Sequence, residues 1–315
     1  MKASWALLRR RDFGLLWAGG LISETGDWLL LVGLPVWVLQ VTGSSLVTAT
    51  VFLVGLLPGL VVGPLAGVLV DRWDHRRTLV AVSLAQAAFL LPLLAVDGRD
   101  RLWVVYLVMA AEATLAQLND PARNALVPTL IPGHDLVGAN ALIGLNANLA
   151  RLAGSPLGGI LVELSGLPGL VIGDAVSFLL GAGLIGLVRP TTLDQARPSP
   201  HARPAQATAV EPRGLVGEWV DGLRVILGDQ GLRWGLVVNG LAAVAQGIFT
   251  VLFVLFVTRV LGGDGGDVGL LRGVQAVGGL LGGVVVVGLA RRLEPGRLLG
   301  ISLLVFTVID LAIWN

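Results

Sequence analysis

The sequence predicts an all-α membrane protein. Of its 315 residues, 55% are hydrophobic and 14% are charged, whereas about 25% charged residues is usual in a soluble domain. The mean hydropathy is +0.82, and residues 28–70 contain no Asp, Glu, Lys or Arg. That run is about twice the ~20 residues with which a helix crosses the hydrocarbon layer. Long apolar runs favour helices over a closed barrel, whose strands would show short alternating segments.

Charged or turn-forming clusters divide the chain into nine apolar segments of spanning length. We predict helices over residues 13–40, 46–70, 78–96, 102–118, 139–163, 168–188, 234–257, 268–290 and 298–315. Between the sixth and the seventh, residues 189–213 hold five prolines among polar residues, a composition typical of a linker. Residues 215–226 place apolar residues at helical spacing opposite charges, which predicts an amphipathic helix on the membrane surface. The expected domains are a six-helix bundle over 1–188, a linker over 189–230 and a partial bundle over 231–315.

The basic residues predict the orientation of the chain. With the N-terminus in the cytoplasm, the cytoplasmic loops and flanks hold 17 Lys and Arg residues and the opposite loops hold three. Because short cytoplasmic loops carry the excess of positive charge, we expect this orientation. No small-residue cleavage site precedes the long first span, so we expect an uncleaved anchor in the cell membrane.

The second part of the chain weakly repeats the first. A shift of 220 residues aligns Gly59 and Gly63 with Gly279 and Gly283. Parallel halves of six helices joined by a long linker are a known transporter architecture. On this alignment Asn315 falls at the end of the third helix of the second half, and a full half would need about 95 further residues. We therefore expect six helices plus three, with the last three absent.

Composition excludes several classes of protein. The net charge of +1 and the scattered basic residues indicate no nucleic-acid surface. The lack of cysteine excludes disulfides, iron–sulfur clusters and Cys-ligated zinc. Lys2 is the sole lysine and is followed by no Gly-rich loop, which excludes a Walker A site. The three histidines lie in predicted loops and no nucleophile–base pair is visible, so we expect neither metal, cofactor nor enzyme.

Four glycines of the second predicted helix share one stripe. Gly55, Gly59, Gly63 and Gly67 follow at intervals of four, which allows another helix backbone to approach closely. Static packing and a moving gate are both compatible with this spacing. The stripe ends at Asp71, whose charge opposes the helix dipole unless cations surround it. Three basic residues follow that can do so, namely Arg72, Arg76 and Arg77.

The run from Gly67 to Arg77, GVLVDRWDHRR, resembles the loop signature between helices 2 and 3 of the major facilitator superfamily. Asp74 stands where that signature has Gly. Other stretches resemble its exporter branch, which includes enterobactin and macrolide efflux proteins. They are RRDF at 10–13, SETGDW at 23–28, DPARNALVP at 120–128 and GSPLGG at 154–159. In the last of these, Pro156 comes one residue later than in the motif of the antiporters.

The resemblance implies two six-helix bundles that rock about a central cavity, with Asp71 and its basic neighbours latching the cytoplasmic side. It also implies that helix 4 lines the cavity and that helices 1 and 5 belong to one bundle. Helix 5 would supply a close-packing motif consisting of Gly154, Pro156, Gly158 and Gly159. The implied protein is a monomer in the lipid bilayer that carries a small-molecule substrate.

Ionisable residues inside the predicted spans are candidate functional groups, because charge is costly there. Glu24 and Asp27 lie three residues apart on one helix face, where two carboxylates cannot easily both ionise, a property that suits a proton carrier. Arg151, in the middle of helix 5, is the expected counter-charge, and a purely structural ion pair stays open as an alternative. Glu112 in helix 4 is a candidate proton or cationic-substrate site, whereas we expect Asp174 in helix 6 to be structural.

These features predict a proton-coupled secondary exporter of small amphipathic molecules or drugs. Asp27, Glu24 and Glu112 would exchange protons, and the motif from Gly67 to Arg77 would form the cytoplasmic gate. Two alternatives stay open. One is a truncated, non-transporting remnant of such a transporter, and the other is a facilitator without ion coupling.

Overall fold

The computed structural model describes residues 6–189, 227–289 and 295–314, and their regular structure is helical with no strand among them. The predicted all-α class is confirmed. The predicted amphipathic helix over 215–226 and nearly all of the predicted linker lie outside the described residues, so the division into domains stays a prediction.

Six of the predicted helices precede the linker. They correspond to α2 (Arg11–Thr42), α3 (Ser45–Val70), α4 (His75–Leu90) with the 3-10 turn η1 (Leu91–Ala95), α5 (Leu102–Ala116) after η2 (Arg99–Arg101), and α7 (Leu136–Gly186). α7 accounts for two of them, because Gly166 interrupts it with φ 62° and ψ −152°. A side chain is strongly disfavoured in that conformation, which glycine adopts readily. The two arms of α7 match the predictions over 139–163 and 168–188.

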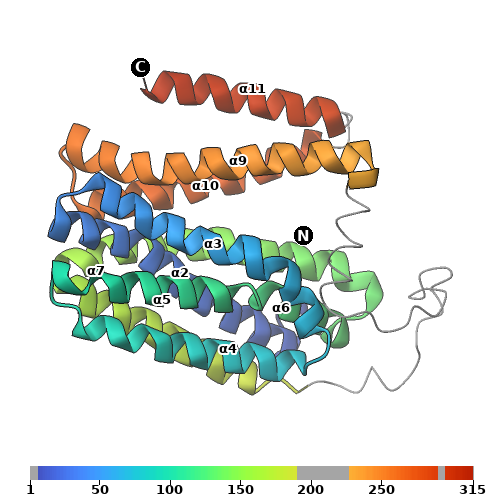
Figure 1. The fold of residues 1–315 in the computed structure, drawn as a ribbon. Helices are drawn as coiled ribbons and strands as arrows, with labels where there is room; N and C mark the ends of the chain where they lie inside the picture. Colours follow the sequence, from blue (N-terminus) through green and yellow to red (C-terminus); the bar gives the residue numbers. More distant parts are fainter. Residues whose placement is uncertain (1–5, 190–226, 290–294, 315) are drawn as a thin grey trace.

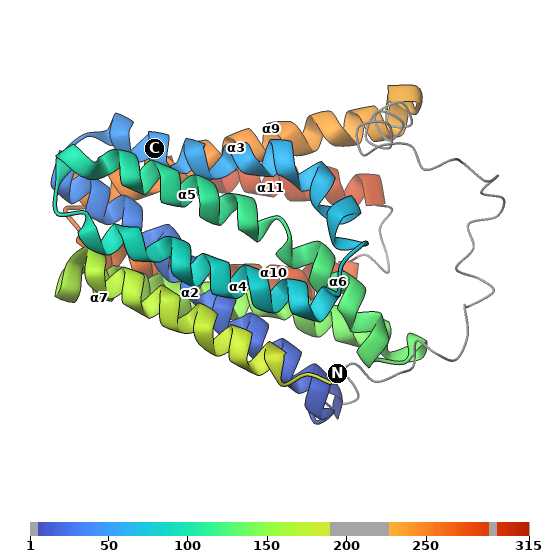
Figure 2. The ribbon, with the colours of Figure 1, turned by 60° about the horizontal axis from the view of Figure 1, so that its bottom comes forward.

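The three helices predicted after the linker are also present. They are α9 (Gln230–Leu255), which continues into the π-helical turn η5 (Phe256–Val260), α10 (Gly265–Leu289) and α11 (Pro295–Trp314). Figures 1 and 2 show all the long helices running roughly along one direction, as in a bundle. In the view of Figure 1, α9 and α10 lie between α11 and the helices that precede the linker.

One helix was not expected. We predicted a loop over 119–138, but α6 (Asn119–Leu130) forms there and is followed by the short turn η3 (Gly133–Asp135). The segment is too polar and too short to be recognised as a span. Its first turn contains Asp120, whose charge suits the positive end of the helix dipole, and Pro121, which is tolerated in a first turn.

α2 and α3 are joined by a tight turn at one end of the bundle. Gly43 has φ 64°, and its N–H donates to the carbonyl of Leu39 at 2.8 Å, which is a common way to end a helix. Ser44 accepts a hydrogen bond from the N–H of Val47 and so caps the start of α3. We call this end of the bundle the Gly43 end. The opposite end, where α3 gives way to α4, is the Asp71 end.

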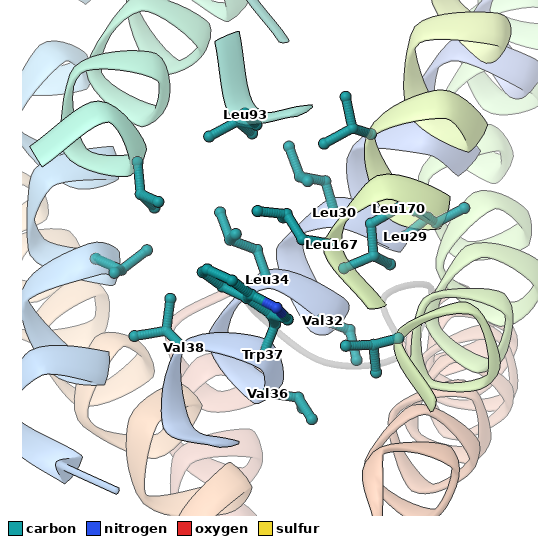
Figure 3. Packing of buried hydrophobic residues seen from close by; sticks show 14 of the residues in the cluster. Leu29, Leu30, Val32, Leu34, Val36, Trp37, Val38, Leu93, Leu167 and Leu170 are labelled. Carbon is teal, nitrogen blue, oxygen red and sulfur yellow. The ribbon is translucent and has the colours of Figure 1, made fainter. Parts of the chain in front are cut away.

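α2 supplies much of the core among the helices that precede the linker. Leu34 and Val38 are completely buried, and Figure 3 shows Leu30 and Leu34 beside Leu167 of α7. A second buried cluster, which includes Phe13, lies toward the start of α2. This core packs α2 against α3, which follows it in the sequence, and against α7, which is distant in the sequence.

The outward faces of the bundle are strongly apolar. Five stretches of the described residues are long and apolar enough to cross a membrane, and Gly133–Gly186, with 54 residues, is long enough to do so twice. Leu53, Leu107 and Leu179 are each more than half exposed. Apolar surface of this extent is unfavourable in water but suits contact with lipid.

Candidate functional site

An ion pair joins α2 to α6 within the first six spans. Arg123 of α6 donates from Nη1 to Oε1 of Glu24, and from Nη2 to Oδ1 of Asp120 at 2.5 Å. The side chains of Arg123 and Glu24 are only 19% and 20% exposed. We expected Arg151 to be the counter-charge of Glu24, and this expectation is wrong, because α6 places Arg123 there instead.

The signal for Arg123 was present in the sequence but depended on secondary structure. Asp120 and Arg123 are three residues apart, a spacing that brings two side chains together only on a helix. With residues 119–138 taken as a loop, the direction of the Arg123 side chain could not be predicted. Because α6 forms there, the side chain points toward Glu24 of α2.

Three further carboxyl groups interact electrostatically with one another, and one of them also interacts with Glu24 of this ion pair. Asp27 of α2 interacts electrostatically with Glu24, and also with Glu112 of α5 and Asp174 of α7. We call Glu24, Asp27, Glu112 and Asp174 the acid cluster. Asp174 was expected to be a peripheral structural residue, whereas the structure brings it against α2.

Glu112 and Asp174 are nearly completely buried, at 7% and 1% exposed. The carboxyl group of Glu112 is hydrogen-bonded to the side chain of Gln86 on α4. Oδ1 of Asp174 accepts a hydrogen bond from the hydroxyl of Ser177 at 3.3 Å. Oε1 of Glu112 and Oδ2 of Asp174 accept no hydrogen bond from the residues that the structure describes. Gly26 makes room for this arrangement, since a Cβ atom there would lie 2.3 Å from Oδ1 of Asp174.

Arg151 lies in a different environment from the one expected. Its Nη2 donates to Oε1 of Gln275 on α10 at 2.6 Å, and its guanidinium lies over the ring of Trp28, 5.1 Å from the ring centroid. Within residues 6–189, 227–289 and 295–314, it forms no ion pair with a carboxylate. It therefore connects α7 to α10 across the two parts of the bundle.

The glycine motif of helix 5 forms a close contact on each side of the first arm of α7. On one side, a Cβ atom on Gly154 would lie 2.2 Å from the carbonyl oxygen of Thr25, and one on Gly158 would lie 2.3 Å from that of Leu29. These contacts are with the backbone of α2. The backbones of α2 and α7 therefore approach closely at Gly154 and Gly158, which small residues allow.

The other side of the same arm meets α10. A Cβ atom on Gly159 would lie 2.1 Å from the carbonyl oxygen of Gly265, and one on Gly269 would lie 2.4 Å from that of Ser155. Pro156 lies in the same contact, against Gly269. The motif thus packs α7 between α2 and α10, which joins the first six spans to the later helices.

The glycine stripe of α3 faces α5, but less closely. A Cβ atom would lie 3.2 Å from Oε1 of Gln117 if placed on Gly63, and 3.5 Å from Nε2 of Gln117 if placed on Gly59. For Gly55 the nearest atom is the methyl group of Met109 at 3.9 Å, and for Gly67 no atom of the described residues lies within 4 Å. The stripe therefore meets side chains and not a helix backbone.

The loop signature at the Asp71 end is arranged differently from the expected latch. Asp71 is exposed, and no ion pair joins it to a basic residue in the described part of the chain. Arg76 donates to the carbonyl oxygen of Gly186 at the end of α7, where the helix dipole favours a cation. Asp74 caps α4 by accepting from the N–H of Arg77 at 2.7 Å. Arg72 is exposed.

A polar contact joins the two parts of the bundle at the Gly43 end. Oε1 of Glu163 on α7 accepts from Nε2 of Gln40 and from the backbone N–H of Gly265, both at 2.9 Å. Nη2 of Arg259 donates to the carbonyl oxygen of Gly43 at 2.9 Å. These residues line a cavity of about 390 Å³. We call this set of contacts the Gly43-end closure.

Comparison with known proteins identifies the family of this chain. Residues 16–314 match the model of the Major Facilitator Superfamily. The chain belongs to this superfamily. It is therefore a multi-pass membrane protein of a family of transporters, as the loop signature and the exporter-like stretches indicated.

Several curated members of the superfamily are similar to the chain. It is 23% identical to macrolide efflux protein A of Streptococcus pyogenes, over 87% of this chain and 65% of that protein. It is 24% identical to multidrug resistance protein MdtG of Salmonella typhimurium, over 94% of this chain and 70% of that protein. It is 30% identical to the multidrug efflux pump Tap of Mycolicibacterium fortuitum, over 50% of this chain and 40% of that protein. The chain thus spans just under two thirds of the length of macrolide efflux protein A.

A solved structure has the same fold. It is the crystal structure of a bacterial homologue of the iron transporter ferroportin in the inward-facing state, with a TM-score of 0.60 and 17% sequence identity. The alignment covers 90% of this chain and 69% of that one. At this identity the likeness concerns the major facilitator fold alone.

Proposed function

We propose that the protein is a secondary active exporter in the cell membrane that moves small amphipathic molecules outward in exchange for protons. Membership of a transporter superfamily and similarity to proteins named as macrolide and multidrug efflux proteins support export. The excess of basic residues on the loops of the Asp71 end supports an N-terminus in the cytoplasm.

The acid cluster is the observation that carries proton coupling. Asp27, Glu112 and Asp174 converge from α2, α5 and α7, and the cluster has one ion-paired arginine, Arg123, bonded to Glu24. Carboxylates in a low-dielectric interior cannot all be charged together with so little compensation. A cluster of this kind can therefore take up and release protons when its access to water changes.

The test is dye transport by inverted membrane vesicles with an imposed proton gradient. Two xanthene dyes of similar size serve as probes, cationic rhodamine 6G and anionic carboxyfluorescein. We expect the variant Glu24→Gln, Asp27→Asn, Glu112→Gln to lose gradient-driven accumulation and to fall to the level of vesicles without the protein.

The matched control removes carboxylates outside the cluster. Asp97→Asn with Asp100→Asn changes two exposed side chains at the Gly43 end and is expected to transport as the unmodified chain does. If the triple variant kept full gradient-driven transport, the assignment of protons to the acid cluster would be wrong. If the unmodified chain transported dye at the same rate with and without the proton gradient, the protein would instead be a facilitator.

The Gly43-end closure supports a cycle in which the two parts of the bundle separate at that end. Glu163 links α7 to the N-terminus of α10, where a carboxylate is favoured by the helix dipole. Its replacement removes the hydrogen bond from the backbone N–H of Gly265, which joins α7 to α10 and is lost when the two parts separate at this end. The bond from Gln40 to Glu163 lies within the first part of the bundle and does not depend on closure. We therefore expect Glu163→Ala to shift the population toward the state that is open at the Gly43 end.

Labelling of a single cysteine measures this shift. The chain has no cysteine, and Thr258 lines the cavity of the closure, so Thr258→Cys reports access from outside to a membrane-impermeant maleimide. Adding Glu163→Ala is expected to raise the labelling rate by about tenfold, since one hydrogen bond to a charged group contributes about 1.5–3 kcal/mol and the lower value is about a tenfold change in the equilibrium. Glu163→Gln retains an acceptor and should give a smaller rise. An unchanged rate in both would show that the contact does not hold the closed state.

A further inference from the structure

Two arginines, one from each part of the bundle, meet near the middle of the membrane-spanning helices. Arg151 lies midway along the first arm of α7, and Arg272 lies in α10 and is only 4% exposed. Both donate to the same atom, Oε1 of Gln275, from Nη2 of Arg151 at 2.6 Å and from Nη1 of Arg272 at 3.5 Å. We call Arg151 and Arg272 the arginine pair.

No described carboxylate compensates the two charges. Within the described ranges, neither arginine takes part in an ion pair, and their partners are neutral. Arg272 donates from Nη2 to the carbonyl oxygen of Thr250 at 3.1 Å and lies over the ring of Phe253, 4.6 Å from the centroid. Arg151 lies over Trp28. A carboxamide and aromatic rings orient a guanidinium group but do not cancel its charge.

The arginine pair also has hydrogen-bond donors to spare. A guanidinium group carries five N–H donors in a planar fork. Nε of Arg151 is buried and donates to no acceptor among the residues that the structure describes. Two planar guanidinium groups, each with one positive charge, match the oxygens of a carboxylate, sulfonate or phosphate. The ring of Trp28 offers an adjoining apolar face.

We propose that the arginine pair binds an anionic group of the transported molecule, so that the substrate is an amphipathic carboxylate, sulfonate or phosphate. This inference rests on the proposed function, which it deepens by naming the charge of the substrate. Because Arg151 and Arg272 come from α7 and α10, the anion would be held from both parts of the bundle at once.

Binding of carboxyfluorescein to the purified full chain in detergent, followed by fluorescence polarisation, tests the proposal. Arg151→Gln and Arg272→Gln are each expected to weaken binding about tenfold or more, because each removes a charged donor from the anion. Arg151→Lys and Arg272→Lys keep the charge and should retain most of the affinity. Arg233→Gln removes an exposed arginine at the start of α9 and should leave binding unchanged.

Thermal melting of each variant separates lost binding from lost folding. If Arg272→Gln does not fold, Arg151→Gln, whose side chain is only partly buried, carries the test alone. Unchanged affinity in folded Arg151→Gln would overturn the proposal. So would displacement of the dye by phosphatidylglycerol in nanodiscs, which would assign the arginine pair to an anionic lipid.

Transport of the two dyes distinguishes this inference from the proposed function. Export of carboxyfluorescein that is lost in the Gln variants supports both. Export of rhodamine 6G alone would leave an exporter in place and contradict an anionic substrate. Export of neither dye by the unmodified chain, with carboxyfluorescein still bound through the arginine pair, would contradict the exporter and keep the anion site.

Discussion

Replacing Gly154 and Gly158 together with alanine is expected to separate α2 from α7 and to destabilise the whole bundle. The two new Cβ atoms would lie 2.2 and 2.3 Å from carbonyl oxygens of α2, at Thr25 and Leu29. Backbone cannot yield as a flexible side chain does, so one helix must move. Overpacking of a close-packed interior costs about 1–3 kcal/mol at each site, and here the cost falls on the helix that carries much of the core.

Fluorescence-detected size-exclusion chromatography after heating measures this effect in detergent. The double variant should lose its monodisperse peak at a markedly lower temperature than the unmodified chain. Gly144→Ala is the matched control, because it lies on the same arm of α7 and, outside its own helix backbone, no atom of the described residues lies within 4 Å of its added Cβ. A double variant that melts at the same temperature as the control would contradict the close approach of α2 and α7.

Replacing Arg123 with glutamine is expected to be the most damaging single change at the acid cluster. It would leave Glu24 in a protein interior without its cation. Removing one partner of a buried ion pair costs about 3–5 kcal/mol, and the lower end applies because the two side chains are still 19% and 20% exposed. Adding Glu24→Gln should restore much of the lost stability, since the uncompensated charge is then gone.

The same melting assay, run on the two single variants and the double variant, gives the coupling between the two residues. Arg10→Gln is the control, because the pair of Arg10 with Asp135 is 3.1 Å long but has side chains that are 45% and 29% exposed. Exposed pairs contribute about 0–1 kcal/mol, so this variant should melt close to the unmodified chain. Equal effects of Arg123→Gln and Arg10→Gln would contradict a buried pair.

The helices were largely predictable from the sequence because lipid imposes one rule on every span. A segment must be apolar and about 20 residues long, and its backbone must bond within itself. All nine predicted helices have counterparts, and the break between the fifth and sixth was placed at 164–167, where Gly166 interrupts α7. α6 was missed because it is short and polar, and such a helix has no signal in a search for apolar runs.

The candidate site was only partly predictable, because contacts across helices depend on how each helix is rotated. Glu24, Asp27 and Glu112 could be chosen as candidates since charge inside a span is costly. Their partners could not, and Arg151 was assigned to the wrong neighbour. Asp174 joins the acid cluster through the space that Gly26 leaves. A glycine of this kind has the same appearance in the sequence as any other.

The acid cluster lies within the part of the bundle that precedes the linker, whereas the arginine pair spans both parts. Every described member of the acid cluster comes from the helices before residue 189, whereas the arginine pair takes one residue from each side of the α7–α10 contact. Gain or loss of a proton would therefore alter the charge of the first part of the bundle alone and would not change the charge at the α7–α10 contact. A bound anion would instead hold α7 and α10 together through both arginines, and its release would allow the two parts of the bundle to move relative to each other.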